Sequence, residues 1–192
     1  MVAQRELPRL QKAYQETVAP KLMEKYSLRN RHQLPKIAKV VVNCGVGRFL
    51  ENQKLKPEIR DTVFDTLSAI TGQRPILIKA RRSVSNFKVR AGAPSAVMVT
   101  LRRDRMWHFL DRLINLAIPR IKDFRGLKDS SFDRGGCYSM GLSEQAVWPE
   151  INVTNLQFTH GMHINISLEH SNPEVSRFLL TELGMPFVSK EK

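Results

Sequence analysis

Four segments of the chain have apolar residues at helical spacing, bounded by residues that start or end helices. The predicted helices cover residues 8–27, 57–72, 104–119 and 171–184. Pro20 should kink the first helix, because it lacks the backbone N–H that a helix interior requires. Gly72 suits the C-terminal end of the second, and Asp104 suits the N-cap of the third. A capping box from Ser171 to Glu174 opens the last helix.

Runs rich in β-branched residues predict short strands between these helices. The predicted strands cover residues 37–43, 76–80, 87–90, 96–102, 138–143 and 162–169. Residues 120–137 lack periodicity and have the composition of an exposed loop. With no internal repeat or linker, the chain is predicted to form one α+β domain over residues 1–192. We expect a two-layer domain with a mainly antiparallel sheet, helices on one face, and loops protruding near 81–95 and 120–142.

Alternation along these strands places polar residues on one face of the sheet, because successive strand side chains point to opposite faces. The apolar set expected to face the helices is Val40, Val42, Ile76, Ile78, Val97, Val99 and Leu101. The opposite face then carries Lys39, Asn43, Lys79, Thr100 and Arg102. Plain solvation accounts for the polar face of many antiparallel sheets. Alternation alone therefore leaves both solvation and a binding surface open.

The charge distribution favours a binding surface. The chain has a formal net charge of +13, and no acidic residue lies between Thr66 and Arg103. Residues 73–128 hold 14 basic and 3 acidic residues, which is +11 of that total. Such a local patch typically meets a phosphate backbone. The bases lie in strand and loop sequence, whereas membrane-surface clusters usually lie on amphipathic helices, and no apolar run approaches the ~20 residues of a membrane span.

The outward strand positions favour paired or structured RNA over single strands. Sheet proteins that hold unpaired RNA stack bases on exposed aromatic rings. Here the outward residues are Lys, Asn, Thr and Arg, which suit hydrogen bonding across a shallow minor groove. We therefore expect an open, polar, RNA-binding face.

Signatures of catalysis and cofactor binding are weak. Gly45-Val46-Gly47 follows a predicted strand, yet the third glycine of a dinucleotide fingerprint is missing and the turn is predicted only to end that strand. The sequence Asp133-Arg134-Gly135-Gly136 lacks the ending of a phosphate-binding P-loop. We predict no cofactor and no catalytic residue, and we interpret Trp107, Phe109 and Trp148 as packing residues.

The metal-ligating residue types give no convincing site either. His160, His163 and His170 form the histidine cluster of the chain, but alternation places the first two on opposite strand faces. Cys44 and Cys137 show no paired spacing and are predicted to be free thiols in a reducing compartment. We predict no bound metal.

Several long motifs closely resemble the bacterial-type large-subunit ribosomal protein five family, which binds 5S ribosomal RNA. They are VVNCGVG (41–47), ITGQRP (70–75), KARRSVSNFKVRAG (79–92), VTLR (99–102), MWHFLDRLINLAIPRIKDFRGL (106–127), SFD (131–133) and YSMG (138–141). The resemblance extends from about Tyr14 to Phe187. Departures from the family pattern fall at Ser85, Asn86, Ser95, Ala96, Cys137, His160 and His163.

The resemblance implies a non-enzymatic protein of the cytoplasmic ribosome, without a membrane role, that helps fix 5S rRNA in the central protuberance. Its implied partners are 5S rRNA, large-subunit rRNA with neighbouring protuberance proteins, P-site tRNA and a small-subunit head protein. The 5S-contact motif of the family matches Asn43, Gln73, Lys79 and Thr100. Alternation also places Asn43, Lys79 and Thr100 on the polar face, together with Lys39 and Arg102.

Two loops carry the remaining implied contacts. The basic loop expected to contact tRNA contains Arg81, Arg82, Ser83, Lys88 and Arg90. The mixed-charge segment expected to form an intersubunit bridge contains Arg120, Lys122, Asp129, Asp133 and Arg134. The alternative function is an RNA-modifying or RNA-processing enzyme that uses the basic face as a substrate platform.

Overall fold

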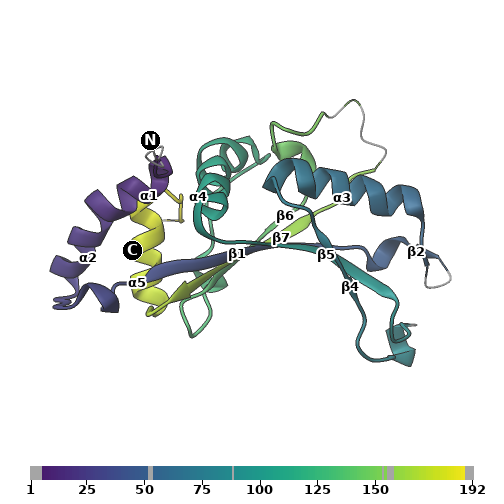
Figure 1. Cartoon of the computed structure of the whole chain (residues 1–192), viewed down its shortest axis with the longest axis horizontal. Helices are drawn as coiled ribbons and strands as arrows, with labels where there is room; N and C mark the ends of the chain where they lie inside the picture. The colour runs from purple at the N-terminus through teal and green to yellow at the C-terminus, as the bar shows by residue number, and fades with distance from the viewer. Residues whose placement is uncertain (1–5, 52–53, 88, 153, 155–157, 189–192) are drawn as a thin grey trace, which may run out of the picture. The chain divides into compact units, whose positions relative to one another are not determined.

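The computed structural model describes residues 6–51, 54–87, 89–152, 154 and 158–188, and it has the predicted α+β fold. Its main feature is an antiparallel five-stranded sheet with the strand order β4-β5-β1-β7-β6 (Figure 1). The strands are β1 (Lys36–Gly45), β4 (Ile76–Lys79), β5 (Pro94–Leu101), β6 (Tyr138–Leu142) and β7 (Met162–Glu169). A separate pair joins β2 (Leu50–Glu51) to β3 (Lys54–Leu55).

Helices occupy the four predicted segments, with interruptions that the periodicity did not reveal. They are α1 (Arg9–Ala13), α2 (Ala19–Lys25), α3 (Pro57–Thr71), α4 (Arg103–Arg112) and α5 (Pro173–Glu182). A π-helical turn at Tyr14–Val18 separates α1 from α2 just before Pro20, so the interruption falls where the proline was expected to disturb the helix. A second π-helical turn, Leu113–Ala117, continues α4.

The chain divides into two compact units, whose boundaries fall within β1, β6 and β7. The first unit comprises Met1–Val40, Arg102–Met140 and Asn165–Lys192. The second unit comprises Val41–Leu101 and Gly141–Ile164.

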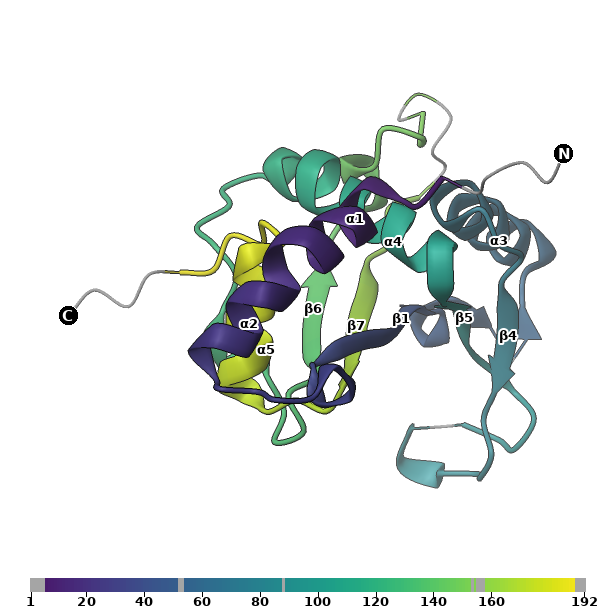
Figure 2. The ribbon, with the colours of Figure 1, turned by 60° about the vertical axis from the view of Figure 1, so that its left-hand side comes forward.

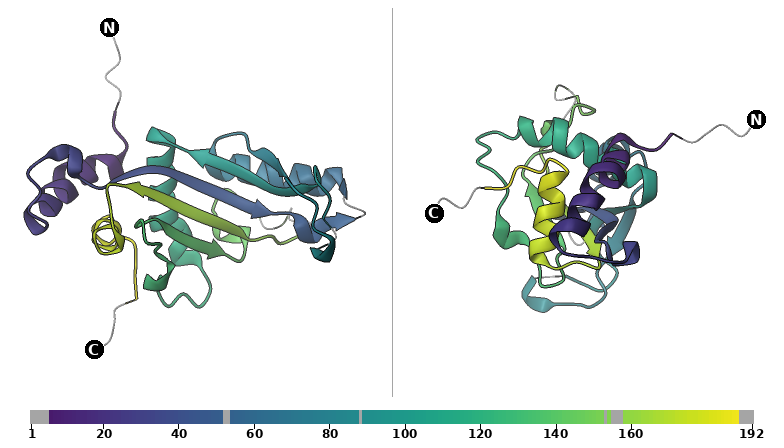
Figure 3. Two further views of the ribbon diagram at one scale, coloured as in Figure 1. Left: turned by 90° about the horizontal axis from the view of Figure 1, so that it is seen from below. Right: turned by 90° about the vertical axis from the view of Figure 1, so that its left-hand side faces the viewer.

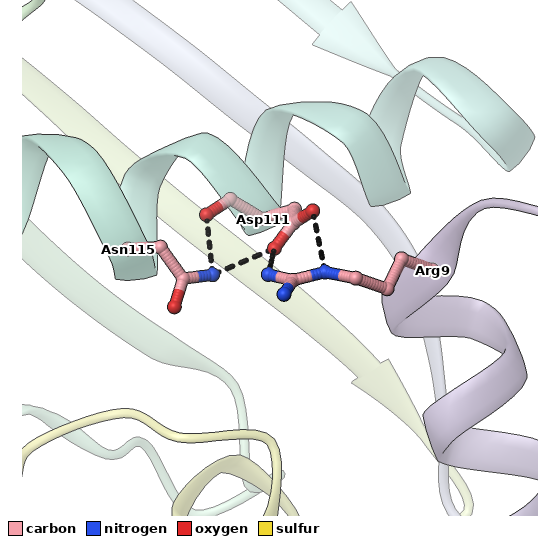
Figure 4. Close-up of polar contacts among 3 residues, drawn as sticks. All are labelled: Arg9, Asp111 and Asn115. Carbon is pink, nitrogen blue, oxygen red and sulfur yellow. Dashed lines mark hydrogen bonds and ion pairs between the residues drawn. The ribbon is translucent and has the colours of Figure 1, made fainter.

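In the first unit, the N-terminal helices pack against α4 and α5. The Tyr14 ring lies 5.7 Å from that of Trp107, and Lys21 forms an ion pair of 2.6 Å with Glu182 on α5, which runs beside α2 (Figure 3). Arg9 at the start of α1 binds both carboxylate oxygens of Asp111 on α4 (Figure 4). Asn115 donates to the same carboxylate, so the acid joins the two helices.

In the second unit, α3 packs against β5 and covers one side of the sheet (Figure 1). The apolar stripe of α3 is buried together with the inward residues of β1 and β5. This core contains Val42, Cys44, Val63, Leu67, Ile70, Val97, Val99, Leu101 and Trp148. Gly72 ends α3 in the left-handed conformation (φ +65°), as predicted.

Three local predictions were wrong. The N-cap of α4 is Arg102, and Asp104 lies inside the first turn. Asn172 rather than Ser171 caps α5: its Oδ1 accepts a bond of 2.9 Å from the N–H of Val175. The predicted strand at 87–90 is absent from its described residues, because Ser85–Phe87 forms a 3₁₀ turn.

Candidate nucleic-acid interface

The face of β4 and β5 opposite α3 carries different residues from those predicted. Leu77 pairs with Val97, which is fully buried, so Leu77 is the β4 residue that faces the core. Ile76 pairs with Met98 and Ile78 pairs with Ala96, which places both isoleucines on the open face. Ile76 is 55% exposed. The prediction that Ile76 and Ile78 face the helices was wrong, and the open face has an apolar centre.

Lys79 nevertheless lies on the open face, because the register shifts between Ile78 and Lys79. This β-bulge pairs Lys79 with Pro94, skipping Ser95, so that two consecutive residues of β4 point to the same side. Lys79 is exposed there.

Three of the predicted 5S-contact residues lie near the opposite end of β5 or on β1. The Gln73 side-chain amide donates to the backbone carbonyl of Thr100 at 3.3 Å, which brings these two residues together. Asn43 is half-buried between the core residues Val42 and Cys44 of β1, and so points to the open face.

Lys79 does not join this group. It pairs opposite Pro94, six residues along β5 from Thr100, or about 20 Å at the usual rise of a strand. The predicted contact residues of the second unit therefore extend along the strand direction and do not converge on one point. Lys39 and Arg102, the other two predicted contacts, belong to the first unit; Lys39 is half-buried and Arg102 is exposed.

The predicted tRNA-contacting loop forms a hairpin between β4 and β5 (Figure 2). Ala80 and Ala93 are joined by a backbone bond of 2.8 Å at its base, and Val84 and Val89 exchange two backbone bonds nearer its tip. The Ser83 hydroxyl accepts from the N–H of Ala91 at 2.9 Å and so braces the hairpin.

The arginines of this hairpin, Arg81, Arg82 and Arg90, are exposed, whereas Lys88 lies outside the described residues. The hairpin is therefore more ordered than a flexible basic loop. It presents its charge from a fixed frame.

The predicted bridge segment is held to the C-terminal part of the first unit over much of its length. Leu127 and Val188 bond through their backbones at 3.0 Å, and Asp129 forms an ion pair of 2.8 Å with Arg177. Asp133 Oδ1 accepts from the N–H of Cys137 at 2.7 Å.

Both acids predicted to form the bridge thus have internal structural partners. The three basic residues of the predicted bridge set are exposed: Arg120, Lys122 and Arg134.

Tyr138 anchors the end of the bridge segment. It packs against Phe132 and Phe187, with ring centroids 4.6 and 5.4 Å away. Burial raises the pKa of Tyr138 to about 12, so its hydroxyl stays protonated and donates to the Lys128 carbonyl at 3.3 Å. Much of the segment is therefore packed, where an exposed loop was expected.

The histidine cluster separates into different environments. His160 is buried, with Nδ1 3.2 Å from Cys44 Sγ, whereas His163 and His170 are exposed. Burial raises the pKa of the Cys44 thiol to about 11, so the thiol is protonated and donates to Nδ1 of His160. No group of three or more metal-ligating side chains gathers in the part of the chain that the structure describes.

Lowering the pH should destabilise the protein through His160. Burial lowers the pKa of His160 below its ordinary value of 6.5, so the unfolded chain binds this proton more readily than the folded one. The contribution of His160 to stability is complete above pH 6.5 and is lost as the pH falls through the folded pKa. Urea unfolding from pH 7.5 to pH 5 should show a smaller decline in the free energy of unfolding for His160→Gln than for the wild type. The control His163→Gln, at an exposed position, should retain the wild-type decline, and equal declines for all three proteins would contradict the assignment.

Among the described residues, no helix has both the length and the apolar character needed to span a membrane. The geometry instead offers an open sheet face, a basic hairpin and a mixed-charge segment, and these suit a macromolecular partner.

Comparison with known proteins identifies the family. Residues 30–90 match the family described as ribosomal protein L5, and residues 94–187 match the C-terminal region that defines the second part of the same ribosomal family. The large ribosomal subunit protein uL5 of Rippkaea orientalis is 47% identical over 93% of this chain and 97% of its own length. Those of Synechocystis sp. (47%; 94% of this chain, 98% of the relative) and Carboxydothermus hydrogenoformans (45%; 94% and 99%) are similarly close. The chain therefore belongs to the uL5 family of ribosomal proteins, and it is a structural, non-enzymatic, rRNA-binding component of the large subunit of cytoplasmic ribosomes.

Proposed function

We propose that this chain binds 5S rRNA through the open face of its second unit and helps attach it to the large subunit in the central protuberance. The observation that carries the proposal is the fold of the acid-free window. Residues between Thr66 and Arg103 form the end of α3, then β4, the hairpin and β5. The unbalanced positive charge therefore belongs to the same elements as the open face, where a polyanion relieves its self-repulsion.

The side chains on this face favour paired RNA. The polar groups of Gln73, Thr100 and Asn43 lie on or beside neighbouring strands, and Lys79 lies about 20 Å from Thr100 along β5. Such an elongated row suits a shallow minor groove, whose 2′-hydroxyls and flanking phosphates are recognised largely by shape. The exposed Ile76 adds apolar contact area between the polar ends.

We extend the proposal to two further contacts. The hairpin with Arg81, Arg82 and Arg90 contacts P-site tRNA, supported by its exposed charge and its ordered frame. The segment from Arg120 to Arg134 contributes an intersubunit bridge to a protein of the small-subunit head. The exposed side chains of Arg120, Lys122 and Arg134 support that bridge, since weak, screened surface charges are easily remade as subunits move. Asp129 and Asp133 support the shape of the segment.

Retention of RNA from a whole-cell extract tests the proposed function. The full-length chain, immobilised and incubated with total cellular RNA, should retain 5S rRNA in excess over its share of the input. Retained RNA is identified by sequencing, and a basic protein of similar net charge serves as the control for unspecific binding. Enrichment no greater than that of the control would contradict 5S recognition by the isolated chain.

The alternative of an RNA-modifying enzyme is not retained, because the chain belongs to a family of structural ribosomal proteins.

A further inference from the structure

The tip of the hairpin presents an aromatic ring to solvent. Phe87, in the 3₁₀ turn Ser85–Phe87, is 78% exposed. The next most exposed large hydrophobic residue among those the structure describes is Ile76, at 55%. Sequence reasoning missed this feature because it placed Phe87 in a strand, where the ring would have packed against a neighbour.

No folding role accounts for this ring. Other phenylalanines pack against aromatic partners: Phe49 lies 5.0 Å from Phe158, and Phe132 lies 4.6 Å from Tyr138. Across the described residues, no ring packs against Phe87. A phenylalanine side chain offers a large apolar area for burial, so its exposure at the end of a hairpin is unfavourable unless a partner covers it.

The surroundings of the ring select the chemistry of that partner. Arg81, Arg82 and Arg90 are exposed in the same hairpin, and the acid-free window contains it entirely. A polyanion therefore complements the hairpin, and the planar ring complements the π-face of a base, which proteins that hold nucleic acids commonly stack on aromatic side chains.

We propose that Phe87 is a stacking platform for an exposed nucleobase of the RNA that the hairpin contacts. The inference rests on the proposed function and deepens it, because it adds a contact to a base where charge alone would give contacts to phosphates. The frame of the hairpin supports this role. The Val84–Val89 backbone bonds and the Ser83–Ala91 bond hold the tip in one conformation, which reduces the entropy lost on stacking. The base belongs either to ribosome-bound tRNA or to rRNA.

The test compares Phe87→Leu, which keeps an apolar side chain without a π-face, with Phe87→Trp, which keeps the stacking surface. Ribosomes carrying each variant are titrated with tRNA, and the isolated full-length proteins are titrated with 5S rRNA, both across a salt series. We expect Phe87→Leu to lose about tenfold in affinity for one of these RNAs, while Phe87→Trp binds at least as tightly as the wild type. The salt dependence of Phe87→Leu should equal that of the wild type, whereas the charge control Arg81→Ala should reduce it by about one unit.

The two arms identify the source of the base, since a loss confined to ribosomes and tRNA assigns the base to tRNA and a loss with 5S rRNA assigns it to rRNA. Equal thermal midpoints of the wild type and Phe87→Leu verify that folding is unchanged. Wild-type affinity of Phe87→Leu for both RNAs, alongside weakened binding by Arg81→Ala, would overturn the stacking proposal and leave the proposed function intact. Failure of the wild-type chain to recognise 5S rRNA would count against the proposed function itself.

Discussion

Replacing Thr100 with valine should weaken 5S rRNA binding by about 1–3 kcal/mol, because a desolvated hydrogen-bonding group of the RNA would lose its partner. Valine has nearly the shape of threonine, and Thr100 is only half-buried, so the fold should tolerate the change. The Gln73 amide bonds the backbone carbonyl of residue 100, which the substitution leaves in place. Filter binding with labelled 5S rRNA measures the effect.

The matched control is Thr62→Val on α3. Thr62 is a half-buried threonine of the same unit whose hydroxyl donates to the Glu58 carbonyl at 2.8 Å. It should bind 5S rRNA as the wild type does. Lys79→Ala provides the complementary electrostatic measurement: its slope of log affinity against log salt should be shallower by about one unit, whereas Lys54→Ala, at an exposed residue of β3, should leave the slope unchanged. If Thr100→Val and Lys79→Ala both match their controls, RNA does not bind this face.

The second large effect concerns stability, and it is expected for Gly136→Ala. Gly136 has φ +77°, and an added Cβ would lie 2.9 Å from the backbone carbonyl of Asn172 and 2.5 Å from Ser176 Oγ. Ser176 is fully buried and bonded to Ser171 at 2.6 Å, so it has little room to move. Left-handed strain of about 1–2 kcal/mol and overpacking of about 1–3 kcal/mol together predict a loss of about 3 kcal/mol.

Gly72→Ala separates these two causes. Gly72 has φ +65°, but no atom lies within 4 Å of the position that an added Cβ would take, so this variant should show the backbone strain alone, about 1–2 kcal/mol. Urea unfolding of both variants gives the comparison. Equal losses would mean that the close approach between Gly136 and Asn172 is relaxed in solution. The expected loss at Gly136 would also loosen the attachment of the bridge segment to α5, and weaker subunit association should accompany it.

The elements that could be predicted from sequence are those with strong boundary residues. The helix α3 begins at Pro57 and is followed by Gly72, as predicted, because a proline in the first turn and a left-handed glycine at the end leave little alternative. The alternation of β7 was also clear: Ile164, Ile166 and Leu168 are buried. Candidate contacts on regular strands, such as Asn43 and Thr100, followed from the same alternation.

The failures have specific physical causes. Ile76, Leu77 and Ile78 are three consecutive apolar residues, so their sequence does not determine which of them faces the core; the pairing of Leu77 with Val97 decides it. Ser171 and Asn172 are both able to cap a helix, and only the backbone geometry selects Asn172. The exposure of Phe87 depends on the Val84–Val89 bonds, which are a property of the hairpin and not of local propensity.

The bulge between Ile78 and Lys79 also separates two design problems that a regular strand would couple. Upstream of it, the orientation of β4 is fixed by the core, through Leu77 and Val97. Downstream of it, the chain enters the hairpin with its phase reset by one residue, so the direction in which Lys79 and the hairpin point is set locally. Evolution could therefore retune the RNA-facing part of this strand by inserting or deleting a single residue at the bulge, without repacking the side of the sheet that lies against α3.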